Sequence, residues 1–331
     1  MLRIHFTVRD LQNIRISRRP QPLWELVCAT CRSGTQQGPL EFGAWRRSVR
    51  ERLTGDPLAR QAVSTLRTLV PPVGYIPDFL TPSVPEEGLP AALEEVRATP
   101  PDRLHRDLAR LRETTPLPAW TTELGRPGGR GMRSLAKILD ISSRVLLEPR
   151  WDHVRRAVGD DTDARSRILL DGGVRALLES LRPFAQWRPP VLEVDYPTDR
   201  DLRLEGRGLL LVPSYFCWRR PTALADPALG PVLVYPVTAR PLDVVPENDD
   251  RLHRLLGRTR ASVLTEVARG RPRSTSEVAT AVGIGLPSAS YQLTVLRDGG
   301  LVTSHREGQH MRHSATPIGH RLLDGDRARL Y

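Results

Sequence analysis

The stretch Ser274-Thr-Ser-Glu-Val-Ala-Thr-Ala-Val-Gly283 is followed directly by Ile284-Gly-Leu-Pro-Ser-Ala-Ser-Tyr-Gln-Leu-Thr-Val-Leu-Arg-Asp-Gly-Gly-Leu-Val302. Ser274 and Glu277 form the Ser-x-x-Glu pattern of a capping box, which satisfies two free backbone N–H groups at the start of a helix. Gly283 ends that helix, and Pro287 opens a second helix at a position where its missing N–H would be unpaired anyway. The stretch therefore predicts two helices joined by a turn.

The second helix has two different faces when it is placed on a wheel at about 100° per residue. Ala289, Leu293, Leu296 and Gly300 share the inner face. Polar groups with few acids cover the outer face, which suits contact with base edges and phosphates in a DNA major groove. Tyr291 and Gln292 are the best candidates for base contacts. The full candidate set on this helix is Ser288, Ser290, Tyr291, Gln292, Thr294 and Arg297.

A strand pair is predicted directly after these helices. Leu301-Val-Thr-Ser-His305 and His310-Met-Arg-His-Ser-Ala315 pair across Arg306-Glu-Gly-Gln309, which makes the segment a winged helix-turn-helix. The tip of the wing offers Arg306, His310 and Arg312 to a neighbouring groove or phosphate. A helix at 258–268 precedes the motif and one from Thr316 closes it, so the domain is expected to span residues 251–325.

The run from Leu256-Gly-Arg-Thr-Arg260 through Ser290-Tyr-Gln-Leu-Thr-Val-Leu-Arg-Asp-Gly-Gly-Leu-Val302 resembles the ArsR/SmtB family of winged-helix repressors. That family typically has Ser-x-His-Leu-x-x-Leu, an Ala-Gly-Leu-Val ending and a wing with Arg-x-Gly. Gln292 stands here where the family has His, and Gly299 where it has Ala. The resemblance covers the last quarter of the chain, and its motifs are more specific for a winged helix than for ArsR against relatives such as MarR.

The metal response of classical ArsR members is not expected here. Their Cys-x-Cys would fall near Glu277-Val-Ala-Thr-Ala281, which contains no cysteine. A zinc site needs four ligands that converge, whereas the local histidines are spread over the wing and the following helix. These histidines, His305, His310, His313 and His320, are expected to be solvated or to contact phosphate. We therefore expect neither a metal nor a cofactor.

Positive charge is concentrated in the same segment. Residues 251–331 hold 13 arginines against six acidic residues, which is +7 of the net charge of +11. A basic surface of this kind favours nucleic acid, because counterions are released when it covers phosphates. No apolar run approaches the roughly 18 residues of a membrane helix, and the start lacks a secretory signal. The chain is expected to be cytoplasmic, with no membrane partner.

The first 245 residues are expected to form one α+β domain. Leu2–Arg9 and Ile14–Ser17 predict two short strands, and the apolar spacing is helical from Pro22 to about Pro183. Four more strands are predicted after Pro190, at Val191–Tyr196, Leu202–Glu205, Leu209–Phe216 and Val232–Val237. The domain is thus mainly helical with a small antiparallel sheet, which the N-terminal strand is free to join. Pro246–Asp250 is the predicted linker to the winged helix.

Cys28-Ala-Thr-Cys31 lies in the first long predicted helix. The two thiols could form a redox switch, or they could be two small buried residues of a helix. Tryptophans of the same domain, Trp24, Trp45, Trp151, Trp187 and Trp218, could line an effector pocket or fill the core. A small-molecule effector therefore remains an open hypothesis without an identified ligand.

No catalytic motif is present, so the chain is not expected to be an enzyme. Asp160, Asp161 and Asp163 cluster beside Gly159, and a helix-capping loop explains them most simply. The sequence instead favours a regulator of transcription, most simply a repressor, with double-stranded DNA as its partner. One winged helix covers too little DNA for useful specificity, so a homodimer on a palindromic operator is expected. The alternatives are a protein-interaction module that never binds DNA and an enzyme-like effector domain fused to a DNA-binding one.

Overall fold

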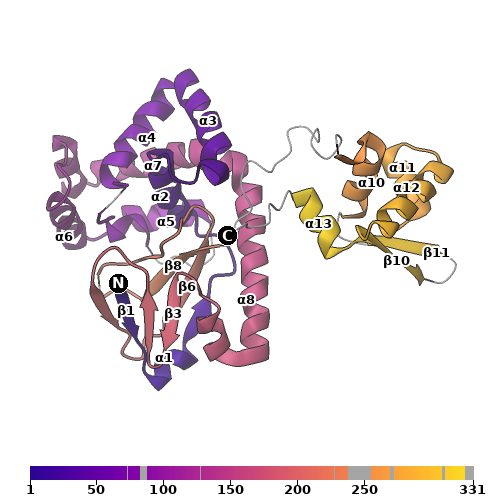
Figure 1. Ribbon diagram of the computed structural model, residues 1–331. Coiled ribbons are helices and arrows are strands. Elements are labelled where there is room, and N and C mark those ends of the chain that lie inside the picture. Colours follow the sequence, from indigo (N-terminus) through magenta and orange to yellow (C-terminus); the bar gives the residue numbers. More distant parts are fainter. Residues whose placement is uncertain are drawn as a thin grey trace. The chain divides into compact units, whose positions relative to one another are not determined.

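The computed structural model of the chain contains two compact units, Met1–Pro241 and Leu242–Tyr331 (Figure 1). The structure describes residues 1–72, 74–82, 88–126, 128–226, 228–237, 255–268, 272–307 and 310–324. Both units combine helices with small sheets, so the expected α+β class is confirmed. The predicted linker at 246–250 lies outside the described residues. In the part of the chain that is described, no helix is long and apolar enough to cross a membrane.

The N-terminus departs from its predicted strand. Strand β1 (Leu2–His5) is shorter than expected, and Val8–Gln12 forms helix α1 before strand β2 (Ile14–Ile16). Thr7 and Asp10 form a capping box, in which the Asp10 carboxylate accepts from Thr7 N at 2.7 Å. That reciprocal pair satisfies two free N–H groups, which is why the alternating pattern gives way to a helix turn.

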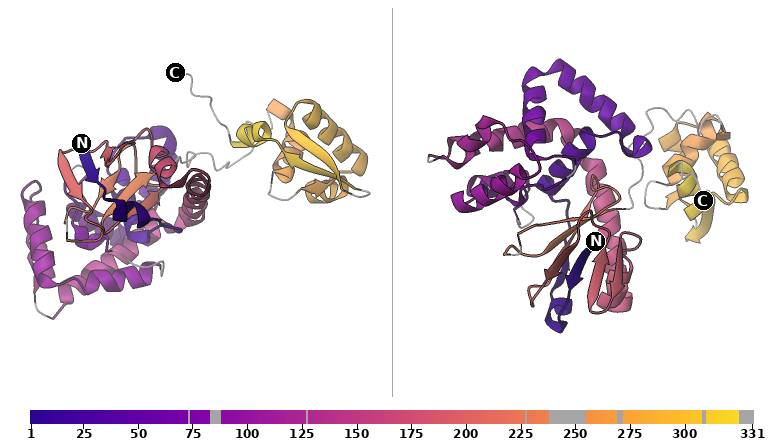
Figure 2. Two further views of the ribbon diagram at one scale, coloured as in Figure 1. Left: turned by 90° about the horizontal axis from the view of Figure 1, so that it is seen from below. Right: turned by 60° about the vertical axis from the view of Figure 1, so that its left-hand side comes forward.

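Helices make up most of the first unit, as predicted. Most of them lie together at one end of it, whereas the longest runs alongside the sheets in Figures 1 and 2. Helix α7 is central, because it packs against α2, α4 and α5. Each helix buries one apolar stripe, and that of α4 consists of Ala59, Ala62, Val63, Leu66 and Leu69. The helices are α2 (Pro22–Ser33), α3 (Pro39–Gly55), α4 (Pro57–Leu69), α5 (Leu89–Arg97), α6 (Pro101–Arg112), α7 (Arg130–Leu146) and α8 (Trp151–Glu179). Short 3₁₀ turns η1 (Asp78–Leu80), η2 (Ala119–Gly125) and η3 (Glu148–Arg150) connect several of them.

Helix α8 corrects the interpretation of the aspartate cluster. Residues 160–163 lie inside this helix rather than in a capping loop, and the axis breaks only later, at Gly173 with φ of 68°. Asp161 pairs with Arg165 at 3.1 Å, and both side chains are at least nine-tenths buried. Tyr235 donates its hydroxyl to the same carboxylate at 2.6 Å, and Arg165 lies over the Tyr235 ring. The cluster therefore fastens the helix to a sheet.

The predicted small antiparallel sheet is in fact two mixed four-stranded sheets. The first has the order β3-β4-β1-β5 and the second β2-β6-β8-β7. β1 is antiparallel to β4, with Leu2 opposite Val194, but parallel to β5, with Leu2 opposite Arg200. β6 is parallel to both β2 and β8. The remaining strands are β3 (Ala185–Arg188), β4 (Val191–Val194), β5 (Arg200–Arg203), β6 (Leu209–Ser214), β7 (Thr222–Ala223) and β8 (Val232–Pro236).

The two sheets share one apolar core. Leu2, Ile4 and Leu192 from the first sheet are fully buried with Leu211 and Leu233 from the second. The last turns of α8 close this core through further leucines. Because β1 lies in the middle of its sheet, the N-terminal strand is an integral part of the unit, as the sequence suggested.

The second unit combines several helices with a small sheet. It contains α10 (Arg258–Val267), β9 (Arg273–Ser274), α11 (Thr275–Val282), α12 (Leu286–Asp298), β10 (Val302–Glu307), β11 (His310–Ala315) and α13 (Pro317–Asp324). The sheet has the order β10-β11-β9 and is antiparallel throughout. The predicted winged helix-turn-helix architecture is therefore confirmed.

Candidate nucleic-acid interface

Helices α11 and α12 begin and end where the sequence predicts. The Ser274 side chain accepts from Glu277 N at 3.2 Å, and the Glu277 carboxylate accepts from Ser274 N at 2.7 Å. Gly283 has φ of 71°, a conformation that favours glycine and turns the chain out of α11. Gly285 caps α12, and Pro287 occupies its first turn. This local chemistry fixes the angle at which α12 leaves the turn.

The inner face of α12 is held by a small core. Ala289, Leu293 and Leu296 are buried, as predicted. The last two pack with residues of α10 and α11, among them Val263, Leu264 and Val278. Gly300 was predicted on this face but is exposed, because it follows the helix in the left-handed conformation, with φ of 69°. Burial of the inner face leaves the opposite face of α12 open.

The candidate residues of the outer face fall into two groups. Ser288, Ser290 and Tyr291 are exposed, and Tyr291 keeps 62% of its surface open. Gln292 is half-buried and turned aside, since its Oε1 accepts from Arg260 Nε of α10 at 3.0 Å. The base-contact hypothesis therefore holds better for Tyr291 than for Gln292.

The other two helix candidates are less open. Thr294 is half-buried. Arg297 is exposed but pairs with Asp298 at 3.3 Å. The face that α12 presents is thus close to neutral and rich in hydroxyl groups, which can donate to bases and phosphates without a net charge.

The strand pairing of the wing is longer than predicted, and its turn is shorter. The strand ladder continues through Arg306 opposite Met311 and Glu307 opposite His310, so two residues of the predicted four-residue turn belong to β10. Arg306 is exposed near this end, where a groove or phosphate can reach it. The side chain of His310 lies outside the described residues.

Arg312 does not lie at the tip of the wing, contrary to the prediction. It pairs with His305 in the strand register, three pairs back from the turn. Its Nη1 contacts Glu277 of α11 at 2.8 Å, and its Nε contacts Glu307 of β10 at 3.0 Å. Two carboxylates thus compensate this guanidinium, which fastens the wing to the first helix of the motif.

His313 does not lie where the sequence predicts. It was expected to be solvated or to contact phosphate, but it is buried between the wing and α11. Its Nδ1 lies 2.8 Å from Ser304 Oγ and its Nε2 lies 3.0 Å from Thr275 Oγ1. Burial, with the charges of Arg297 and His305, lowers the pKa of His313, so the ring is neutral at pH 7. The alternation of β11, which places His313 on the same face as Ala315, was the available signal.

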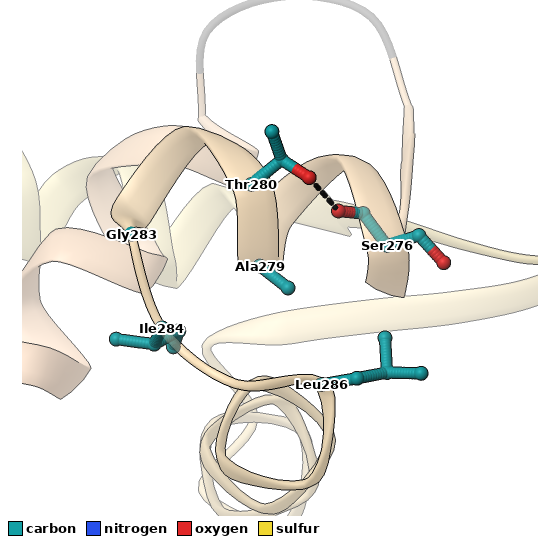
Figure 3. Close-up of a pocket in the computed structure, with 6 residues that line it drawn as sticks. All are labelled: Ser276, Ala279, Thr280, Gly283, Ile284 and Leu286. Carbon is teal, nitrogen blue, oxygen red and sulfur yellow. Dashed lines mark hydrogen bonds between the residues drawn. The ribbon is translucent and has the colours of Figure 1, made fainter.

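A shallow groove lies beside the motif, between α11 and the start of α12 (Figure 3). It has a volume of about 470 Å³ and is lined by Ser276, Ala279, Thr280, Gly283, Ile284 and Leu286. Thr280 donates its hydroxyl to the Ser276 carbonyl at 3.0 Å, as Figure 3 shows. Leu286 is half exposed at its edge. The groove therefore combines an apolar floor with helix hydroxyl groups on one side.

The cysteines of the first unit lie in an environment that disfavours thiolates. Cys28, Cys31 and Cys217 are free and buried. A hydrogen bond with Cys217, together with burial, raises the pKa of the Cys28 thiol well above its ordinary value. Burial raises the pKa of Cys31 to about 12. Since the thiolate is the reactive form, this environment favours two inert core residues over a redox switch.

Several of the tryptophans considered as pocket lining pack against other rings. Trp45 lies 4.8 Å from the Phe216 ring centroid, Trp218 lies 5.3 Å from Phe42, and Trp187 lies 5.3 Å from Phe6. These are core contacts. Within the described ranges, no group of three or more His, Cys, Asp or Glu side chains is placed to hold a metal ion.

Comparison with known proteins gives a match for the second unit alone. A family model described as a helix-turn-helix domain matches residues 255–305, from just before α10 into β10. No curated protein and no solved structure matches the chain. The C-terminal unit is a helix-turn-helix domain, and such a domain indicates a DNA-binding regulator.

Proposed function

We propose that the protein is a cytoplasmic transcriptional repressor that binds a palindromic operator as a homodimer, and that no enzymatic step is involved. The observation that supports DNA binding is the open face of α12. Ser288, Ser290 and Tyr291 are exposed on a helix whose opposite face is fixed in a core. A helix presented in this way can enter a major groove and contact base edges.

The wing supports the same proposal. Its strands are fastened to α11 through Arg312 and Glu277 on one side and through His313 and Thr275 on the other. Arg306 is carried near the turn of this fixed hairpin. A wing held in place relative to α12 can contact the phosphates beside the groove that the helix occupies.

The resemblance to ArsR/SmtB repressors supports the finer parts of the proposal. Two-fold dimers place two recognition helices about 34–36 Å apart, which matches successive major grooves on one side of DNA. The first unit would then supply dimer contacts, an effector site or both. Analytical ultracentrifugation of the full chain, alone and with a two-site duplex, tests the dimer.

Selection of genomic fragments with the purified protein tests DNA binding. We expect enriched fragments with a shared inverted repeat, and affinity that falls as salt rises. Tyr291→Ala should reduce discrimination between the best site and its base variants by about 1–3 kcal/mol for each contacted pair. Glu95→Gln, which changes an exposed polar side chain of the first unit, is the control and should bind as the wild type does. If no fragment binds even at low salt, the domain is instead a protein-interaction module.

A further inference from the structure

Arg260 is a cation that reaches α12 from another helix. It lies in the first turn of α10, and its Nε donates to Oε1 of Gln292 at 3.0 Å. A guanidinium can only donate hydrogen bonds, so the amide must turn its oxygen towards Arg260 and its NH2 group away from it. Gln292 lies one turn after the exposed Ser288, on the same side of α12. The amide is therefore held at the edge of the helix face that is open to DNA.

The remaining donors of this pair are free among the residues that the structure describes. Nη1 and Nη2 of Arg260 and Nε2 of Gln292 form no hydrogen bond with a described residue. Both side chains are half-buried, but none of these three nitrogen atoms is sealed from solvent. A ligand in contact with α12 can therefore reach them.

The charge of Arg260 is not compensated by a described carboxylate. Four acidic side chains of the second unit are described, and each of them pairs with a different arginine from Arg260. These pairs are Glu266 with Arg273, Glu277 with Arg312, Asp298 with Arg297 and Glu307 with Arg312. Arg260 therefore brings an uncompensated positive charge to α12.

This arrangement changes which base the amide can recognise. A glutamine alone contacts adenine with two bonds, in which its NH2 group donates to N7 and its carbonyl accepts from the N6 amino group. The Gln292 carbonyl keeps a second lone pair, but an adenine amino group placed there would face the N–H groups of Arg260. Guanine instead presents two neighbouring acceptors, O6 and N7. A pair of side chains that offers only donors thus matches guanine and opposes adenine.

We propose that Arg260 and Gln292 together recognise one guanine of the operator, with the free N–H groups of both side chains on its O6 and N7 atoms. The inference rests on the proposed function, because it takes α12 to lie in a major groove. It adds a specificity-determining residue from α10, outside the helix-turn-helix itself. It also assigns the base, since Arg260 changes a side chain typical of adenine recognition into one that selects guanine.

Relative affinities for duplexes that differ at one base pair test the proposal. A ratio of affinities does not depend on the fraction of a variant that is folded. Gln292→Ala locates the contact, as the base pair of the best selected site at which discrimination falls. The wild type should prefer guanine to adenine at this position by about tenfold. A duplex with 7-deazaguanine there lacks the N7 acceptor and should bind the wild type about tenfold more weakly than guanine does.

Two substitutions in α10 separate Arg260 from a general loss of charge. Arg260→Met removes the donors, keeps a long side chain and frees the carbonyl of Gln292. The preference for guanine should then fall by about tenfold, so that adenine binds at least as well. Arg258→Met removes an exposed arginine two positions earlier, and as the matched control it should keep the wild-type preference.

Several results would overturn this inference alone, because DNA binding is intact in each of them. A wild-type preference for adenine at the located position would show that the Gln292 carbonyl is free to accept. An unchanged preference in Arg260→Met, or an equal change in Arg258→Met, would remove Arg260 from base recognition. If Gln292→Ala changes discrimination at no position, the pair contacts no base. Failure of the wild type to bind any duplex would instead refute the proposed function, and this inference with it.

Discussion

Glu25 should make the stability of the first unit depend on pH. Its side chain is fully buried, and its carboxylate accepts from the backbone N–H groups of Tyr215 and Phe216 at 2.8 and 3.0 Å. The Ser214 hydroxyl donates to the same group at 3.0 Å. Burial raises the pKa of Glu25 from its ordinary 4.5 to about 7, although these hydrogen bonds favour the charged form.

The sign of the effect follows from the raised pKa. The folded state holds the proton more tightly than the unfolded state, so the contribution of Glu25 to stability is largest below pH 4.5. That contribution is lost as pH rises through about 7 and changes no further above pH 8. The gap in pKa corresponds to about 3 kcal/mol, at about 1.4 kcal/mol for each unit.

Urea unfolding followed by tryptophan fluorescence measures this contribution, since every tryptophan lies in the first unit. Glu25→Gln keeps the shape of the side chain but removes the titration. We expect the free energy of unfolding of the wild type to fall by about 2.5 kcal/mol more than that of the variant between pH 5 and pH 8. Glu95→Gln, at an exposed position of α5, is the matched control and should follow the wild type.

The argument from burial is tested by comparing how the free energy of unfolding depends on pH in the wild type and in Glu25→Gln. Burial also raises the pKa values of Asp78 and Asp107, so a fall in stability with pH remains in the variant, and only the difference belongs to Glu25. Parallel profiles for Glu25→Gln and the wild type would show that Glu25 titrates alike in the folded and unfolded states. The argument from burial would then be refuted.

Three further substitutions test the remaining interpretations. Arg312→Ala should weaken binding to all duplexes alike. It should leave the slope of log affinity against log salt concentration nearly unchanged, because the charge of Arg312 is already compensated by carboxylates. If Arg312 instead contacts phosphate, the substitution would lower that slope by about 0.9. Asp161→Asn should destabilise the first unit by about 3 kcal/mol or more in urea, because Arg165 is left buried without its partner; a loss below 1 kcal/mol would contradict the packing argument. Peroxide should leave the thiol count and DNA affinity of the native protein unchanged, since Cys28 and Cys31 are buried with raised pKa values; a lost pair of thiols would restore the redox hypothesis.

Features that depend on a few neighbouring residues could be predicted from the sequence. The box of Ser274 and Glu277, the turn at Gly283 and the inner face of α12 are all fixed within one or two helix turns, and each formed as expected except at Gly300, which follows the helix. A capping box was also present in the sequence at Thr7 and Asp10, but the alternation of apolar and polar residues around it led to the prediction of a strand. Asp10 is also fixed by Gly208 N at 2.9 Å, a contact across most of the unit that no local pattern contains.

Pairing partners that are distant in the chain could not be predicted. β1 lies between β4 and β5, whose paired residues are 186 to 198 positions away in the chain, and its direction differs with respect to the two neighbours. An alternating strand indicates which face is buried but does not indicate which strand it joins or in which direction. The burial of Asp161 has the same origin, because its partner Tyr235 comes from β8.

The candidate interface shows why a count of arginines overstates the number of cations that DNA would meet. Residues 251–331 hold 13 arginines, but three of them have carboxylate partners, which the net charge of +7 already includes. Arg273 pairs with Glu266 at 2.8 Å, Arg297 with Asp298 at 3.3 Å, and Arg312 with Glu277 at 2.8 Å. Ion pairs of this kind release few counterions on binding, because their charge is already compensated. Hydroxyl groups and Tyr291 must then carry much of the recognition by α12, so binding should depend more on base sequence and less on salt than the number of arginines implies.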